Sequence, residues 1–411
     1  MPLRQVPSSS SPRIDGIEFF TNAANAGGAF MLNEASTTSA VETIEGWETE
    51  VRAGSRIVVA RGTGPESFEH ATAESIDAAN RGLDMLSARG ILDAWIREAD
   101  DQHISWWAEN GEQVIRLVSV PTARVDVGNV TVTGGIQVEP AAPEWHESLR
   151  YFRLSQITDD LVDAYRNLYL ALECLLSRLA PQRSNPNGSP TENEGDWLKR
   201  ALGEAGQLVN LESYVPPGAG DPVATLFDDL YRDIRSNLLH AKSSRPTILP
   251  HTGARRGEVA ASLQRATSLY LGLAEHELHV RRPGGGIFAG LWRMQTDSLV
   301  GRLKIVATDD SAAISPDDDV VNPAGGAIVE LETCAAPEYD QPFERAFLGR
   351  VAGRELGTLD PVTRVCTVVD DAPYSAHTPE GELRIDQVDR FEALVILRAE
   401  NVRQPKRRYA S

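Results

Sequence analysis

The chain has 411 residues, of which 41% are hydrophobic and 24% charged, and at roughly 100 to 200 residues per domain this length predicts two or three globular domains. Its 59 acidic and 40 basic side chains give a net charge of -19, which argues against a surface built for non-specific binding of nucleic acids or anionic membranes. Cys174, Cys334 and Cys366 lie far apart without a CxxC pair, so neither a disulfide framework nor a Cys-type zinc site is expected. No uncharged apolar run reaches the roughly 18 residues of a membrane span, and a cytoplasmic protein is expected.

The N-terminal part of the chain, residues 16–140, predicts an α+β domain. Short runs rich in β-branched residues, such as 56–60 and 114–120, indicate strands between Gly, Pro and Asn breaks. Residues 71–89 instead carry apolar side chains three or four positions apart, and Gly90 follows them. This spacing predicts one helix that covers the strands.

The apolar spacing becomes helical between residues 145 and 282. Residues 161–179 carry an apolar stripe, and Asp221 followed by Pro222 is typical of a helix N-cap and first turn. The helix that they open has its apolar side at residues 226–238. Four or more helices with short connections predict a compact bundle.

Strand signals return in residues 287–400, for example at 303–307 and 394–397. Residues 1–15 and the basic residues 401–411 are expected to be disordered tails. The expected fold class is therefore α+β multidomain. It consists of a central all-α bundle of four to five helices, flanked by an N-terminal α+β domain and a C-terminal β-rich domain.

The acidic residues are unevenly distributed. Residues 147–282 contain 16 basic and 17 acidic side chains, so nearly all of the net charge belongs to the flanking regions. Residues 234–257 contain no acidic residue and five basic ones. These are Arg235, Lys242, Arg245, Arg255 and Arg256. The basic segment either complements a helix C-terminus beside a solvated loop or forms an anion site, such as one for phosphates.

Arg235 and His240 stand at the end of the predicted amphipathic helix. RNA cleavage without a metal needs a base for the ribose 2'-hydroxyl and a cation for the charge on the phosphate, and these two residue types suit those tasks. Five positions on an ideal helix turn by about 140°, so two copies facing each other across a dimer converge better than one. In the structural alternative, His240 complements the helix dipole and Arg235 pairs with Asp228 or stacks on Tyr231.

The end of this helix resembles the Arg-x4-6-His signature of the HEPN family. The residues that carry the resemblance are Tyr231, Arg235, Asn237, Leu238 and His240. Ser236 directly follows the arginine, where that family usually has Asn, Asp or His. The resemblance covers about residues 145–282, and it implies a HEPN-like helical bundle that dimerises and builds a composite cleft from two such motifs.

The first functional hypothesis is a metal-independent endoribonuclease of the toxin or antiviral kind. His240 would act as base or acid, Arg235 would stabilise the phosphate, and Asn237 would orient a group in the site. The predicted RNA- and phosphate-binding residues are Lys242, Arg245, Arg255 and Arg256. Residues 275–279 offer two histidines but no third ligand, so neither a metal nor a cofactor is expected.

The second hypothesis is a non-catalytic binding or scaffold protein. Its helical bundle would form a homodimer, and the acidic outer domains would contact a protein or a small ligand. Residues 151–170 resemble proteins of the methylamine utilization protein J family. That resemblance implies an accessory protein and no particular chemistry.

Overall fold

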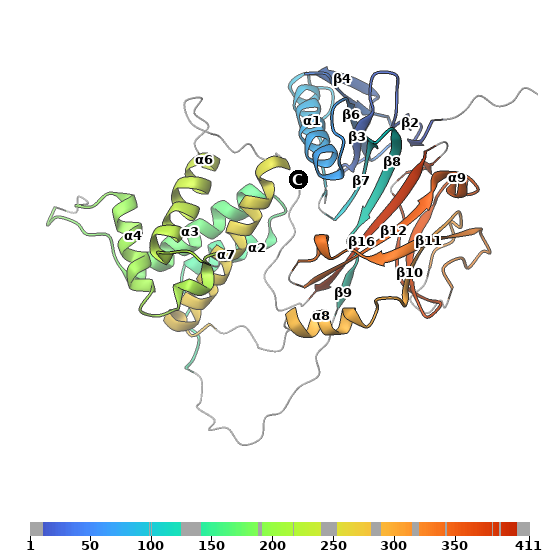
Figure 1. The fold of residues 1–411 in the computed structure, drawn as a ribbon. Helices are drawn as coiled ribbons and strands as arrows, with labels where there is room; N and C mark the ends of the chain where they lie inside the picture. The colour runs from blue at the N-terminus through green and yellow to red at the C-terminus, as the bar shows by residue number, and fades with distance from the viewer. Residues whose placement is uncertain are drawn as a thin grey trace, which may run out of the picture. The chain divides into compact units, whose positions relative to one another are not determined.

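The structure is a computed structural model, and the chain divides in it into two compact units (Figure 1). The described residues are 11–97, 99, 101–124, 141–187, 191–216, 218–239, 253–280, 289–314, 320–341, 343–379, 381–385 and 388–400. One unit, here called the sheet unit, lies within Met1–Val127 and Gly286–Val402. The other, here called the helical unit, lies within Gly128–Gly285.

The sheet unit is built around a mixed sheet that has 13 strands in the described part of the chain, and both ends of the chain contribute to it (Figure 1). The N-terminal strands are β3 (Ala26–Met31), β4 (Ala40–Ile44), β5 (Trp47–Val51), β6 (Ile57–Gly62), β7 (Gln102–Glu109), β8 (Glu112–Ser119) and β9 (Thr122–Arg124). The C-terminal strands are β10 (Leu303–Thr308), β11 (Ile328–Ala335), β12 (Glu344–Ala352), β13 (Arg364–Val369), β14 (Ala372–His377) and β16 (Arg390–Glu400). The strand order is β14-β13-β10-β11-β12-β16-β8-β7-β3-β6-β5-β4, with β9 also paired to β16.

The two halves of this sheet meet where β8 and β16 pair in parallel. The register runs from Arg390 opposite Val114 to Val395 opposite Ser119. Both strands are nearly continuous apolar runs that are buried over most of their length. This is the pattern expected of strands covered on both faces. The other pairs along the strand order are antiparallel.

Helix α1 (Phe68–Ala88) covers the N-terminal strands, as predicted for residues 71–89. Ser67 caps its first turn by accepting a hydrogen bond from the backbone N–H of His70, and Gly90 follows with φ +66°. The buried face of α1 includes Ile76, Leu83 and Leu86, which pack in one core with residues of β3, β5 and β6. The remaining elements of the unit are short. They are β1 (Arg13–Ile14), β2 (Ile17–Glu18), β15 (Leu383–Arg384), α8 (Ala289–Asp297), η3 (Pro337–Tyr339) and α9 (Gly353–Leu356).

The helical unit has its own core, which is centred on helix α3 (Leu161–Leu179). Its other helices are α2 (Ser148–Ile157), α4 (Glu194–Ala205), η1 (Leu211–Tyr214), α5 (Pro222–Phe227), η2 (Asp228–Arg235), α6 (Ser236–Leu239) and α7 (Gly253–Leu278). The predicted apolar stripe of α3 is confirmed, since Leu161, Leu168 and Leu175 are buried. Asp221 caps α5 as predicted, and its carboxylate accepts hydrogen bonds from the N–H groups of Val223 and Ala224.

The predicted fold class is wrong. It placed a central bundle of four to five helices, residues 145–282, between an α+β domain at 16–140 and a β-rich domain at 287–400. One mixed sheet dominates the structure instead, and its strands come from both predicted outer domains. Within the described residues of the helical unit the helices range from 4 residues in η1 and α6 to 26 in α7, and α5, η2 and α6 follow one another without a break. Such helices do not make a central up-and-down bundle. Apolar runs mark strands, but they do not say which distant strands pair.

Candidate functional site

Arg235 lies at the end of η2, a segment wound as a π-helix between α5 and α6. The wider winding is visible at Ser236, whose backbone N–H donates to the carbonyl of Tyr231, five positions earlier. Two neighbouring helices hold the segment in place. The hydroxyl of Tyr165 on α3 donates to the carbonyl of Leu230 at 3.0 Å, and Arg265 on α7 pairs with the carboxylate of Asp229 at 2.8 Å.

The guanidinium of Arg235 is held by one carboxylate and two aromatic rings. Its Nη2 donates to Glu194 Oε1 at 2.7 Å. Its Cζ lies 4.9 Å from the ring centroid of Tyr231 and 5.4 Å from that of Tyr169. Only 20% of the side chain is exposed. These contacts fix the orientation of the cation before any ligand is bound, because a guanidinium stacks on aromatic faces and binds carboxylates in a defined plane.

Glu194 is the first residue of α4, and Asn193 caps that helix. A carboxylate at a helix N-terminus is stabilised by the helix dipole. The second oxygen of Glu194 accepts a hydrogen bond from the hydroxyl of Tyr231 at 3.3 Å. The charge of Arg235 is therefore balanced by a carboxylate that the N-terminus of α4 and the hydroxyl of Tyr231 hold in place.

A second carboxylate, that of Glu173 on α3, interacts electrostatically with both Glu194 and Arg235. Burial raises the pKa of Glu173, the Glu194 carboxylate raises it further, and Arg235 lowers it. Two polar atoms in this cluster lack a hydrogen-bond partner among the residues that the structure describes. They are Nε of Arg235 and the hydroxyl of Tyr169. Both atoms are buried, so hydrogen-bonding capacity in this cluster is left unused.

Of the two contacts that the structural alternative predicts for Arg235, the structure shows the one with Tyr231. Arg235 does lie over the ring of Tyr231, but Asp228 pairs with a different arginine, Arg232, at 3.1 Å. Arg232 is 62% exposed. It presents a solvated cation one turn before Arg235.

The other predicted site residues are not brought to Arg235 by any described contact. The amide of Asn237 donates to the backbone carbonyl of Asp233 at 2.8 Å. Arg255 pairs with Glu258 at 2.8 Å, and Arg256 is buried, with 8% of its surface exposed. The remaining predicted residues lie outside the described residues. They are His240, Lys242 and Arg245.

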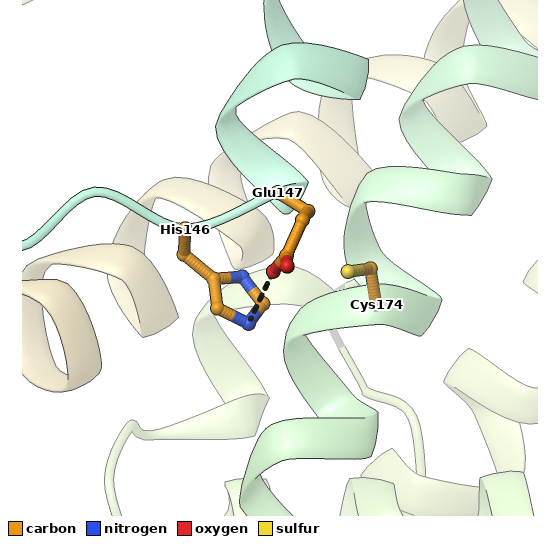
Figure 2. A group of neighbouring side chains, drawn as sticks. All are labelled: His146, Glu147 and Cys174. Atoms are coloured by element: carbon orange, nitrogen blue, oxygen red, sulfur yellow. Dashed lines mark ion pairs between the residues drawn. The ribbon is translucent and has the colours of Figure 1, made fainter.

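A separate group of side chains gathers where α2 begins beside α3 (Figure 2). It consists of His146 and Glu147, which directly precede α2, and Cys174 of α3. One donor atom of each residue lies within 4.8 Å of the other two. Nε2 of His146 and Oε2 of Glu147 are 3.5 Å apart. Nitrogen, oxygen and sulfur donors therefore face one another in the helical unit.

Cys174 in this group is not an activated nucleophile. Burial raises the pKa of its thiol, the carboxylates of Glu147 and Glu173 raise it further, and a backbone hydrogen bond from Ser148 lowers it. A thiol whose pKa is raised carries little thiolate at neutral pH. A Cys-His catalytic pair needs the opposite shift.

Sequence reasoning missed this group because its members lie 27 positions apart and form no ligand motif. The two histidines that it did consider, His276 and His279, are not part of the group. Within the described residues, His276 and His279 do not form a group of three ligand atoms that all lie within 4.8 Å of one another. The adjacent pair His146–Glu147 before a helix was the one local signal that could have drawn attention to it.

The chain matches no family model, no curated protein and no solved structure. The resemblances to the HEPN family and to methylamine utilization protein J therefore stay predictions. Every helix in the described part of the chain is too short or too polar to cross a bilayer.

Proposed function

We propose that the helical unit binds RNA through Arg235 and the basic segment that follows it, and that a homodimer of the protein cleaves the bound strand in the cytoplasm without a metal. The observation that carries the proposal is the guanidinium of Arg235, which Glu194 and two tyrosine rings hold in one orientation. His240 follows five positions later. The resemblance to HEPN nucleases implies that Arg235 and His240 act together in RNA cleavage.

The proposed chemistry requires a cation that needs no reorganisation when charge develops on the phosphate. A guanidinium has five N–H donors, and Glu194 takes one of them at Nη2. Nε of Arg235 has no partner in the described structure. That atom is buried, so a phosphate oxygen would bind another N–H of this 20% exposed side chain without displacing Glu194, while His240 supplies the base for the 2'-hydroxyl.

The π-helical winding supports the same location. Such segments are rare, and they occur frequently at functional sites. Here the winding sets Tyr231 and Arg235 against each other and is held by the contacts of Tyr165 and Arg265. The π-helical segment spans Asp228–Arg235, so the proposed phosphate ligand lies at its last residue.

RNA binding tests the proposal directly. We expect the full chain to bind a labelled single-stranded RNA in fluorescence anisotropy, with an affinity that decreases steeply as salt rises, because phosphate contacts release counterions. Arg235→Ala should weaken binding by about tenfold or more, since a charged hydrogen bond contributes roughly 1.5 to 3 kcal/mol. Arg232→Ala is the matched control, because Arg232 is exposed one turn earlier, and it should change affinity less than twofold. Equal effects of the two substitutions would contradict the proposal.

A non-catalytic binding protein is the second candidate, and one observation favours it. Glu194 and Glu173 both lie near Arg235, so the cation could serve only to lock η2 against α3 and α4. In that case RNA would not bind even at low salt. The helical unit would then mediate dimerisation, and the acidic sheet unit would contact a protein or small-molecule partner.

A further inference from the structure

We propose that His146, Glu147 and Cys174 bind a zinc(II) ion, with a water molecule as the fourth ligand. Imidazole, carboxylate and thiolate are the three side-chain ligands that zinc takes in proteins. The thiolate and imidazole select against magnesium and calcium, which prefer sites made of oxygen atoms alone. This site is separate from Arg235 and does not depend on the proposed reaction with RNA.

The spacing of the donor atoms agrees with a tetrahedral ion. Zinc–ligand bonds of about 2.0 to 2.3 Å place neighbouring donors roughly 3.3 to 3.7 Å apart. Nε2 of His146 and Oε2 of Glu147 are already 3.5 Å apart. The three donors all lie within 4.8 Å of one another, so a small side-chain movement brings the Cys174 sulfur to the same spacing. The side chain of Glu147 is 68% exposed, which gives the carboxylate room to follow the ion.

The histidine also has the outer contacts of a metal ligand. Nδ1 of His146 lies 3.0 Å from the hydroxyl of Ser148, and that hydroxyl lies 3.0 Å from the hydroxyl of Tyr270. Ser148 and Tyr270 are both fully buried. Without a metal, Nδ1 accepts the backbone N–H of Ser148 at 3.3 Å. When an ion binds Nε2, the ring proton lies on Nδ1 instead, where the hydroxyl of Ser148 accepts it and donates onward to Tyr270. Metal-binding histidines generally donate the N–H of their second ring nitrogen to a nearby hydrogen-bond acceptor.

The local charge favours a cation. The ionised ligands carry two negative charges, one on Glu147 and one on the Cys174 thiolate, and the ion balances both. When zinc binds, the Cys174 proton leaves to solvent and a sulfur–zinc bond forms. Arg178, four positions after Cys174 on α3, is engaged by the carboxylate of Glu144 through two hydrogen bonds of 2.7 Å.

A bound ion would join the start of α2 to the middle of α3. Figure 2 shows that His146 and Glu147 come from the chain before α2, whereas Cys174 projects from α3 toward them. No disulfide fixes this junction, because Cys174 is a free cysteine. We therefore expect zinc to stabilise the helical unit as a ligand that binds only the folded state.

Cobalt(II) is the probe that tests the site, because cobalt bound to a thiolate gives a near-ultraviolet charge-transfer band and tetrahedral cobalt gives visible bands. The metal-free full chain should develop both on titration with Co²⁺, and Zn²⁺ should abolish them. Cys174→Ser should lose the charge-transfer band. Cys334→Ser should keep it, because Cys334 is an exposed cysteine of the sheet unit.

Two further variants keep the test decisive if Cys174→Ser fails to fold. His146→Asn retains an acceptor for the backbone N–H of Ser148, which Nδ1 of His146 accepts at 3.3 Å, but it has no Nε2. Glu147→Gln changes an exposed side chain. Each should weaken Co²⁺ binding at least tenfold while circular dichroism stays unchanged. Absence of a charge-transfer band in the wild-type protein, or a band that survives in Cys174→Ser or is lost in Cys334→Ser, would overturn the assignment.

Discussion

Arg116 and Glu392 lie 276 positions apart in the chain, yet Nη2 of the arginine is 2.6 Å from a carboxylate oxygen of the glutamate. They are register partners on β8 and β16, so their ion pair crosses the line where the N-terminal and C-terminal halves of the sheet meet. Their side chains are 7% and 2% exposed. Arg350 and Arg390 also reach Glu392, each at 3.1 Å.

Removing the charge of Glu392 should therefore destabilise the sheet unit strongly. Glu392→Gln leaves the buried Arg116 cation without its carboxylate, and breaking a buried pair in this way costs about 3 to 5 kcal/mol. The shift in the urea midpoint of unfolding, followed by tryptophan fluorescence, measures this loss of stability. Glu330→Gln is the control, because Glu330 forms an exposed pair with Lys304, and such pairs contribute less than about 1 kcal/mol. Similar midpoint shifts for the two variants would refute this account of the junction.

Glu194 is expected to act as a positioning residue for Arg235, with opposite effects on RNA affinity and turnover. Glu194→Gln removes a negative charge beside the phosphate ligand, worth about 1 kcal/mol under solvent-like screening, so Kd for RNA should fall roughly fivefold. The turnover number should fall about tenfold, because the guanidinium is no longer held in one plane.

The control for Glu194 is Glu192→Gln. Glu192 pairs with Arg200 at 2.5 Å and should affect neither Kd nor turnover. A rise in Kd for Glu194→Gln, with turnover unchanged, would show that Glu194 does not position Arg235 in the proposed way.

His377 should contribute to acid destabilisation. Burial lowers the pKa of His377 to about 4, and His377 lines a small hollow together with largely apolar residues such as Ile14, Met31 and Leu117. The unfolded chain binds the proton more tightly than the folded chain, so stability is present above pH 6.5 and is lost as the pH falls toward 4. His377→Gln should show a smaller loss of urea midpoint between pH 7 and pH 4.5. His70→Gln, at an exposed position of α1, should behave like the wild type.

The sequence predicted those parts of the fold that local patterns determine. The apolar stripes of α1 and α3 and the Asp221–Pro222 helix start are each set by neighbouring residues. The pairing of β8 with β16 could not be predicted, because any buried apolar strand can pair with any other until the rest of the sheet is known. This one unpredictable pairing turned two expected domains into a single sheet.

In the candidate sites, too, local sequence patterns could be predicted and long-range contacts could not. Arg235 was identified from its spacing to His240, but its partner Glu194 lies 41 positions earlier, and the π-helical winding depends on contacts from α3 and α7. Arg256 was chosen for its charge, and its burial depends on packing that the sequence does not display. The proposed zinc ligands come from two segments whose proximity follows from the packing of α2 on α3.

Cleavage of a labelled single-stranded RNA in Mg²⁺-free buffer is the measurement that tests the central claim most directly. The account predicts that the wild-type protein and Arg232→Ala cleave at the same rate, that Arg235→Ala and His240→Ala each lose about a hundredfold or more, and that a strand lacking 2'-hydroxyls is not cleaved. Absence of cleavage by the wild-type protein, or cleavage that persists in Arg235→Ala and His240→Ala, would contradict it.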